Sequence, residues 1–305
     1  MKTTTLLVLF LILAACSQGT KVLEPGQKLK VMAATPHLAS LAMAIAGDAA
    51  EVEMLPPADK VSHDYSPTME DRRRLEKCHL LLINGLKLES WDPPKVARAA
   101  RVTLVDCGAG LDAKFLIDEE EAEHGHGHDH DHAHGENNPH VWMCAEGAIL
   151  QARAIAETFA GFDKAGTEGY RARLKGLEQR LTALRDKYKP LVEKLSRKNF
   201  VSNHDAFPYL AREYGLRQVG VIQRTPGSNP ALAERRKIEE TIKSGGAHAI
   251  FLEPGYDDSA SRAIAESTGL KLATLDPFDA GKPGPRALEE VLEQNLKTVL
   301  ATLGD

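Results

Sequence analysis

The sequence predicts an α/β protein with two parallel-sheet lobes joined by one long helix. Short β-rich runs alternate with helical patterns in the first half of the chain, and the same alternation restarts after residue 195. A long amphipathic pattern lies between the two halves. Alternation of strand and helix is typical of a parallel sheet with crossover helices. Because the alternation occurs twice, we expect two such lobes.

The first lobe is predicted to span residues 28–162. Its β-rich runs are separated by helical patterns such as 37–46 and 68–77. The candidate strands are KLKVMAA (28–34), EVEML (51–55), LLLIN (80–84) and VTLVD (102–106).

The second lobe is predicted to span residues 197–305, with a helix after each strand. Its candidate strands are NFVS (199–202), RQVGVI (217–222), AIFLE (249–253) and KLATL (271–275).

Residues 163–196 predict the linking helix, because apolar residues recur there at alternating spacings of four and three. One helix over this seam would run about 39 Å at about 1.5 Å per residue, long enough to brace both lobes. Pro190 should kink it near its end, since proline removes a backbone donor. A coiled-coil dimerisation helix is the alternative. The seam residues are Tyr170, Leu174, Leu177, Leu181, Leu184, Tyr188, Leu191 and Leu195.

The N-terminus predicts export. Residues 1–16 carry an early lysine, an apolar run from Leu6 to Leu13, and then Ala-Ala-Cys. Such a run is too short to cross a hydrocarbon core of about 30 Å, so it reads as a signal peptide. Its end resembles a bacterial lipobox, in which Cys16 would be lipidated, with an ordinary cleaved signal as the alternative. Residues 17–27 are polar with Pro and Gly, as expected of a tether.

Composition excludes some classes of protein. Beyond Cys16 the chain has only Cys78, Cys107 and Cys144, so at most one internal disulfide could form and no disulfide framework exists. The redox state of these three is left open. Loss of Lys2 with the signal moves the formal charge from −5 to −6. That balance argues against nucleic acid as a partner.

Four candidate metal ligands follow predicted strands or open a helix. His63 lies in SHDYSPT after the second strand, His140 in NPHVW, His204 in SNHDAF after the fifth strand, and Asp276 in LDPF after the last. Ligands collect beyond the carboxyl ends of strands in open parallel sheets. Three imidazoles and one carboxylate match the donors that zinc accepts in tetrahedral geometry. Because two come from each half, the site would lie between the lobes.

A single histidine in an α/β protein is more often a cap or a satisfied polar group than a ligand, so the coincidence of all four carries the assignment. His37 begins a helix, while His79 and His248 begin strands, and we expect these three to be structural. Glu253, at the end of AIFLE, is the reserve carboxylate.

The repeat HGHGHDHDHAHG is a separate feature, within a loop predicted to span 118–138. Its histidines alternate with Gly, Asp and Ala and follow an acidic run, so nothing in it can bury a core. We expect a mobile loop that binds metal weakly, because each ion must order a flexible chain. A low-complexity insert without consequence is the alternative. The auxiliary histidines are His124, His126, His128, His130, His132 and His134.

Four segments carry a resemblance to a known family: SHDYSPTMEDRRRLEKCHLLLINGLKLESW, NPHVW, SNHDAFPYLAREYGL and TLDPF. They resemble the zinc- and manganese-binding solute-binding proteins of bacterial ABC importers, a cluster that includes metal-binding lipoprotein adhesins. The resemblance implies a buried metal between two lobes and delivery to a membrane permease. It places the ligands at His63, His140, His204 and Asp276. A histidine as third ligand is typical of zinc members, so His204 favours Zn²⁺.

The chain departs from the family's pattern in two places. Met143 and Cys144 follow NPHVW, where the family usually continues with leucine and aspartate. We expect Cys144 to be a small packed residue. The segment RTPGSNPALAERR is only loosely similar to the family's loop, which bears on contacts with the permease.

The predicted function is an extracytoplasmic zinc receptor, anchored to a membrane by its lipid, working with an ABC importer permease, and monomeric. The alternatives are a manganese or iron receptor of the same family, or a metal-binding surface adhesin. A secreted zinc hydrolase would need an open coordination position and a base, for which Asp205 or Glu253 could serve. No HExxH motif or nucleophile elbow is present, so we predict that the protein is not an enzyme.

Overall fold

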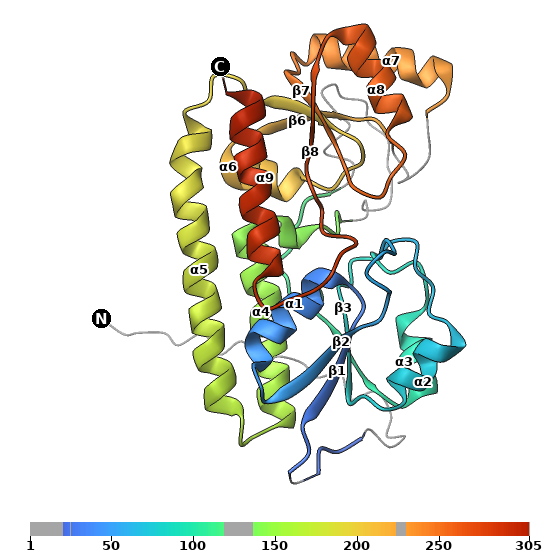
Figure 1. Ribbon diagram of the computed structural model, residues 1–305, viewed down its shortest axis with the longest axis vertical. Coiled ribbons are helices and arrows are strands. Elements are labelled where there is room, and N and C mark those ends of the chain that lie inside the picture. The colour runs from blue at the N-terminus through green and yellow to red at the C-terminus, as the bar shows by residue number, and fades with distance from the viewer. Residues whose placement is uncertain (1–20, 25, 119–136, 224–229, 305) are drawn as a thin grey trace.

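The computed structural model describes residues 21–24, 26–118, 137–223 and 230–304. It contains two four-stranded sheets, and every strand pairing is parallel (Figure 1). The predicted fold class is therefore confirmed. The predicted signal peptide with Cys16, part of the tether and the histidines of the repeat lie outside the described residues.

The first sheet has the strand order β2-β1-β3-β4. Each predicted strand is present, shortened or shifted by no more than two residues at either end. The helices are α1 (Pro36–Ala46), α2 (Met69–Leu75) and α3 (Pro93–Ala100). The strands are β1 (Leu29–Ala33), β2 (Ala50–Met54), β3 (Leu80–Ile83) and β4 (Thr103–Asp106).

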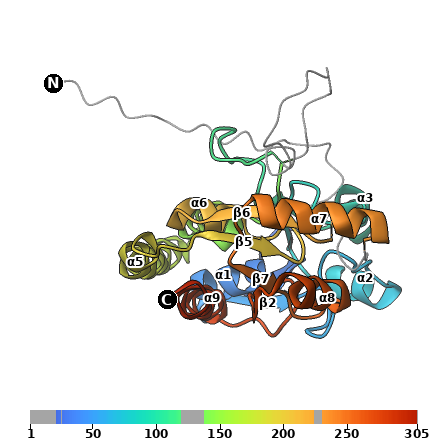
Figure 2. The ribbon, with the colours of Figure 1, turned by 90° about the horizontal axis from the view of Figure 1, so that it is seen from above.

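The second sheet repeats this topology with the order β6-β5-β7-β8. Figure 2 shows α7 and α8 beside its strands. The helices are α6 (Pro208–Tyr214), α7 (Leu232–Ser244) and α8 (Ser259–Thr268). The strands are β5 (Asn199–Ser202), β6 (Arg217–Val221), β7 (Ala249–Leu252) and β8 (Lys271–Thr274).

The three longest of the described helices are α4 (Ala145–Phe162), α5 (Thr167–Glu193) and α9 (Ala287–Leu303), and α9 contacts both α1 and β8. Figure 1 shows α5 running past both sheets with α9 beside it. Helix α5 packs against α1, α4 and α9 of the same chain. The apolar seam of α5 therefore packs within the chain. A dimerisation helix would instead present this seam to a second copy.

The buried face of α5 drifts from the predicted seam near its C-terminal end. Tyr170, Leu177 and Leu181 are buried, as the seam predicts, but Leu191 is 44% exposed and Val192 is fully buried. A repeat of 3.5 residues falls behind a helix of 3.6 residues per turn by about 20° per heptad. After three heptads the residue that follows the predicted seam position, Val192 instead of Leu191, faces the core.

Two helices of the first lobe, α1 and α2, begin at polar caps. Thr35 precedes Pro36, the first residue of α1, and its side chain accepts from the backbone N of Leu38. Thr68 and Asp71 form a capping box at α2. Both caps satisfy backbone donors that a helix start leaves unpaired.

Among the residues that the structure describes, no helix is long and apolar enough to cross a membrane.

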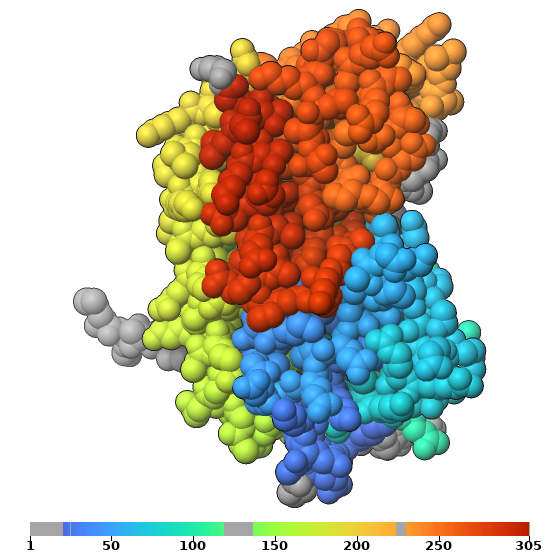
Figure 3. All heavy atoms as spheres, viewed as in Figure 1, coloured from blue at the N-terminus to red at the C-terminus, as the bar shows by residue number. Residues whose placement is uncertain are grey.

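The chain returns to the first lobe between β8 and α9. The backbone N of Gly281 donates to the carbonyl O of Ala58, and the backbone N of Gly284 donates to Oγ of Ser40. In the space-filling view the atoms of this return lie directly against those of the first lobe (Figure 3). A segment that follows the second sheet is thus fastened to the first.

Candidate metal centre

Four side chains from distant parts of the chain meet between the two sheets: His63, His140, His204 and Asp279. Each offers one ligand atom, and these atoms all lie within 4.8 Å of one another. Three of the four residues are buried, and His63 is partly exposed. The structure therefore brings together the three histidines predicted from sequence.

Each ligand atom is placed by the end of a regular element. His63 lies in the connection between β2 and α2, and His140 immediately precedes the short 3₁₀-helix Val141–Met143. His204 follows β5, and Asp279 follows β8. Carboxyl ends of parallel strands meet at one edge of a sheet. Two sheets facing each other at such edges bring the four residues to one point.

The spacing of the donor atoms matches a small tetrahedral ion. Nε2 of His140 lies 3.0 Å from Nε2 of His63 and 3.2 Å from Nε2 of His204. Nε2 of His63 lies 3.8 Å from Oδ2 of Asp279. With zinc–ligand bonds of about 2.0–2.1 Å, the edge of a ligand tetrahedron is about 3.3 Å. These three separations lie close to that edge, and all four donor atoms lie within 4.8 Å of one another, so side-chain movements could close them around a zinc ion.

The fourth residue of this cluster is Asp279, where the sequence predicted Asp276. Oδ1 of Asp276 accepts from the backbone N of Phe278, and the backbone N and O of Asp276 both bond the Asn295 side chain. Strand β8 ends at Thr274, so the chain needs a further turn before it reaches the cleft. Asp276 lies in that turn, and Asp279, three residues later, brings its carboxylate to the three histidines. The repeated Asp in LDPFD, with Asp before Pro as a turn signal, was the available clue.

The turn that carries Asp279 is held against the first lobe. Nε1 of Trp142 donates to the carbonyl O of Pro277 at 2.8 Å. The backbone N and Oγ of Ser62 donate to the carbonyl O of Asp279. Trp142 also stacks on His37, with ring centroids 3.7 Å apart. These contacts hold the backbone of the turn and leave the carboxylate of Asp279 available for a ligand.

Two of the three imidazoles are supported through the nitrogen that faces away from the cluster. Oδ1 of Asn138 lies 3.2 Å from Nδ1 of His140 and also accepts from its backbone N. Nδ1 of His204 faces Oε2 of Glu253. A proton on Nδ1 leaves Nε2 with a free lone pair for a metal. His140 and His204 are thus oriented for ligation.

Burial sets the protonation of the cluster. It lowers the pKa of His63 to about 3, helped by the charge of His204, and lowers the pKa of His140 well below its usual value. Burial also raises the pKa of Asp279 to about 7. For His204, burial would lower the pKa, but the Glu253 carboxylate outweighs it and the pKa is raised. Two imidazoles are therefore neutral and ready to ligate at neutral pH.

One buried oxygen at the centre has no hydrogen-bond partner among the described residues. Oδ1 of Asp279 is inaccessible to solvent and unbonded, and the whole residue is 3% exposed. An unpaired buried carboxylate oxygen is costly unless a cation or donor satisfies it. The site thus has the chemistry of a cation site and fits a divalent metal.

The remaining sequence candidates lie outside the cluster. Nε2 of His37 lies 3.2 Å from Oδ1 of Asn84, and Nδ1 of His79 accepts from the backbone N of Lys30. His248 lies directly before β7, and its backbone N bonds the carbonyl O of Asn199. None of the three belongs to the metal cluster. Their predicted structural role agrees with these contacts.

The three described cysteines are free and buried. Sγ of Cys144 caps α4 by accepting from the backbone N of Gly147, in place of the usual oxygen cap. Cys144 is not part of the metal cluster. The departure from the family's pattern after NPHVW is therefore a change of helix cap.

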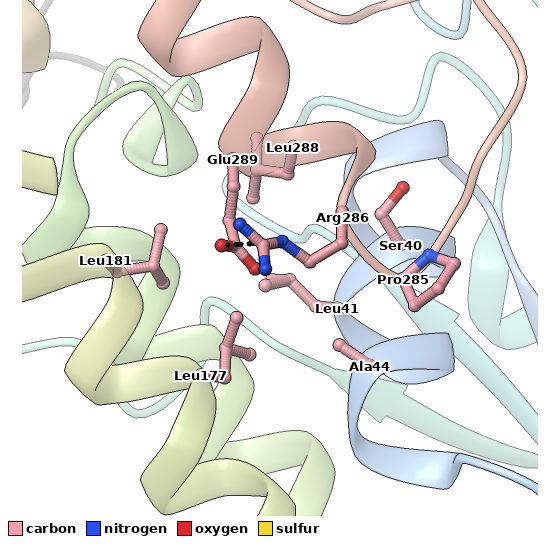
Figure 4. Close-up of a pocket in the computed structure, with 9 residues that line it drawn as sticks. All are labelled: Ser40, Leu41, Ala44, Leu177, Leu181, Pro285, Arg286, Leu288 and Glu289. Carbon is pink, nitrogen blue, oxygen red and sulfur yellow. Dashed lines mark ion pairs between the residues drawn. The ribbon is translucent and has the colours of Figure 1, made fainter.

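A small surface pocket lies elsewhere, between α1, α5 and the start of α9 (Figure 4). On its wall Glu289 is held by Arg180 and by Arg286, which binds it at 3.0 Å. Leu41, Leu177 and the other side chains around it are mainly apolar. No residue of the metal cluster lines it, so it belongs to the packing of α5 against α9.

Comparison with known proteins agrees with this architecture. Residues 31–302 match the family model described as the periplasmic zinc-uptake complex component A, ZnuA. The chain is 27% identical over 280 residues to the manganese ABC transporter substrate-binding lipoprotein PsaA of Streptococcus pneumoniae, covering 88% of this chain and 87% of PsaA. It is 28% identical over 275 residues to the high-affinity zinc uptake system protein ZnuA of Bacillus subtilis, covering 88% and 86%.

A solved structure shares the fold. The solute-binding protein FpvC of Pseudomonas aeruginosa, in complex with Ni²⁺, superimposes with a TM-score of 0.79 at 23% identity. The match covers 91% of this chain and 97% of FpvC.

Proposed function

The chain belongs to the zinc-uptake complex component A family, and from that premise we propose that it is an extracytoplasmic receptor that captures Zn²⁺ and delivers it to an ABC-type importer. The metal is cargo in this role, so the site must bind it tightly and release it whole. The observation that carries the proposal is the closed cluster of three imidazole nitrogens and one carboxylate oxygen.

The donor set favours zinc over manganese. Imidazole nitrogen suits zinc, whereas manganese prefers carboxylate, carbonyl and water oxygens. Only Asp279 supplies oxygen here, and His204 supplies nitrogen as the third ligand. A manganese or iron receptor remains the alternative within the family, because PsaA is a manganese protein of similar sequence.

The same cluster argues against catalysis. A zinc hydrolase keeps three protein ligands and an open position for water. In the cluster the fourth position is taken by the carboxylate of Asp279, and the backbone carbonyl O of this residue accepts from Ser62. Both carboxylate oxygens of Asp205, a candidate base, already accept hydrogen bonds, one from Gln218 and one from Asn138. A receptor is the function that this arrangement favours.

The cellular setting is part of the proposal. Lipidation at Cys16 would hold the receptor at a membrane surface, facing the periplasm or the cell exterior, beside its permease. We propose that it acts there as a monomer, since the seam of α5 packs within the chain. An additional role as a surface adhesin is compatible with the same fold.

Metal analysis tests the proposal. We expect one tightly held zinc per chain after exhaustive dialysis of the purified protein. His140→Ala should abolish the tight site, whereas His248→Ala, outside the cluster, should keep it. Equal zinc retention in both variants would show that the site has been misplaced.

A cell assay separates transport from adhesion. Deletion of the gene should slow growth only when zinc is scarce, and added zinc should restore growth. A deletion strain that grows normally under chelation but loses attachment to surfaces would favour the adhesin.

A further inference from the structure

We propose that Glu253 is a positioning residue of the metal site: it orients His204 for ligation and supplies the second fixed negative charge that balances a divalent ion. This inference rests on the proposed function and deepens it. Glu253 belongs to no ligand cluster among the described residues. Its role would be exerted through His204.

The sheet places Glu253 behind His204. Strands β5 and β7 are neighbours, and Ser202 pairs with Phe251 in their register. His204 lies two residues after Ser202, and Glu253 lies two residues after Phe251. Both side chains therefore leave adjacent strand ends at the same edge of the sheet.

Both oxygens of the Glu253 carboxylate are used by the same residue. Oε1 accepts from the backbone N of His204 at 2.8 Å, and Oε2 faces the ring Nδ1. The Glu253 side chain is fully buried, and that of His204 is 4% exposed. A carboxylate held in this way fixes both the backbone and the ring of His204.

This contact decides which ring nitrogen can bind a metal. A carboxylate accepts but cannot donate when it is ionised, so Nδ1 must carry the proton and Nε2 keeps its lone pair. Nε2 of His204 is the atom that faces Nε2 of His140 in the cluster. Histidine ligands are generally held in their reactive tautomer by such a second partner, which also makes the ring more basic.

Glu253 also contributes to the charge balance of the buried site. Three neutral imidazoles and Asp279 offer one negative charge to a doubly charged ion. Glu253, in contact with His204, adds a second negative charge beside the ion. His140 differs, because its supporting residue Asn138 is an uncharged amide. A buried site stabilises an ion best when its charge is compensated nearby.

The test compares Glu253→Gln with a matched control. Glutamine keeps the shape and the acceptor for the His204 backbone, but it loses the charge, and its amide can donate to Nδ1 and favour the wrong tautomer. The control is Glu213→Gln, a partly buried carboxylate that accepts from the backbone N of Ala145 and Glu146 and contacts no member of the metal cluster. Zinc affinity is measured by competition with a chromophoric chelator. The visible spectrum of the Co²⁺ form reports the number and geometry of ligands.

We expect Glu253→Gln to weaken zinc about 10–100-fold, the usual cost of losing such a partner, with the four-coordinate Co²⁺ spectrum retained. Glu213→Gln should stay within about threefold of the wild type. Glu253→Asp, which keeps the charge on a shorter arm, should recover part of the loss. Circular dichroism and melting of the metal-free proteins establish that each variant is folded.

Two results would overturn the inference. One is a Glu253→Gln protein with zinc affinity within about threefold of the wild type. The other is a change of coordination number in its Co²⁺ spectrum, which would make Glu253 a ligand. If Glu253→Gln does not fold, Glu253→Asp decides: at least threefold weaker binding supports the inference, and unchanged affinity overturns it. A wild-type protein that holds no zinc would instead overturn the proposed function.

Discussion

Ser62 donates two hydrogen bonds to the carbonyl oxygen of Asp279, one from its backbone N at 2.8 Å and one from Oγ at 2.7 Å. His63 follows Ser62 directly, so this contact ties two members of the metal cluster together across the cleft. The segment that carries Asp279 follows a strand of the second sheet, yet it is fastened to the first lobe. His204 is tied to the first lobe in a similar way, because Nδ2 of Asn138 donates to the carbonyl O of Asp205, the next residue, at 2.7 Å.

The two aspartates of LDPFD should respond differently to substitution. Asp279→Asn should weaken zinc binding by at least about 100-fold, because the ligand charge is lost from a buried site. Asp276→Ala should keep the tight site and lower the free energy of unfolding by about 1 kcal/mol, because the hydrogen bond from the backbone N of Phe278 is lost. Chelator competition and urea unfolding measure the two effects. The opposite pattern would restore Asp276 as the ligand.

Zinc affinity should fall as the pH is lowered through about 7. Asp279 must be ionised and His204 neutral to ligate, and the pKa of Asp279 is raised to about 7 by burial while that of His204 is raised by Glu253. Protons therefore compete with zinc at these two groups. His63, whose pKa is lowered to about 3, and His140 are already neutral and do not compete.

The check is an affinity series from pH 8 to pH 5. The slope of the logarithm of zinc affinity against pH should approach two, which corresponds to two protons released for each zinc bound. A titration in weakly buffered solution measures the released protons directly. An affinity that stays flat over this range would contradict the protonation states derived for His204 and Asp279.

The third histidine should set the choice of metal. His204→Glu replaces an imidazole by an oxygen ligand, so the preference for zinc over manganese should fall by at least about tenfold. Competition between the two ions for each protein measures the ratio. Because Glu253 would then face a second carboxylate, His204→Glu with Glu253→Gln should bind manganese more tightly than His204→Glu alone. Unchanged selectivity would mean that the geometry of the cleft, and not the donor atom, selects the metal.

Deletion of residues 119–136 should leave one tight zinc per chain. All four cluster residues lie outside the deleted stretch, and Asp118 and Asn137 already pair as a β-bridge that a short linker can join. Calorimetry should lose only the weaker additional binding events that the sequence predicts for the histidine repeat. Loss of the tight site in a folded deletion protein would mean that the repeat supplies a ligand.

The sequence by itself determined the two parallel sheets, the long linking helix and three of the four cluster residues. Hydrophobic runs alternating with helical patterns are local signals, and they can be recognised without knowledge of the packing. Likewise, His63, His140 and His204 could be found because each lies at the end of an element whose position the pattern gave. Their convergence follows from the common edge of parallel strands.

Only the tertiary structure decided the fourth residue and the support of the imidazoles. Whether Asp276 or Asp279 reaches the cleft depends on how a turn docks on Ser62 and Trp142, which lie in the other lobe. The place of Glu253 behind His204 depends on β5 and β7 being neighbours, although β6 lies between them in sequence. Periodicity reports which face of an element is buried. It carries no information about which distant side chain a turn will meet, because that is set by the packing of the whole chain.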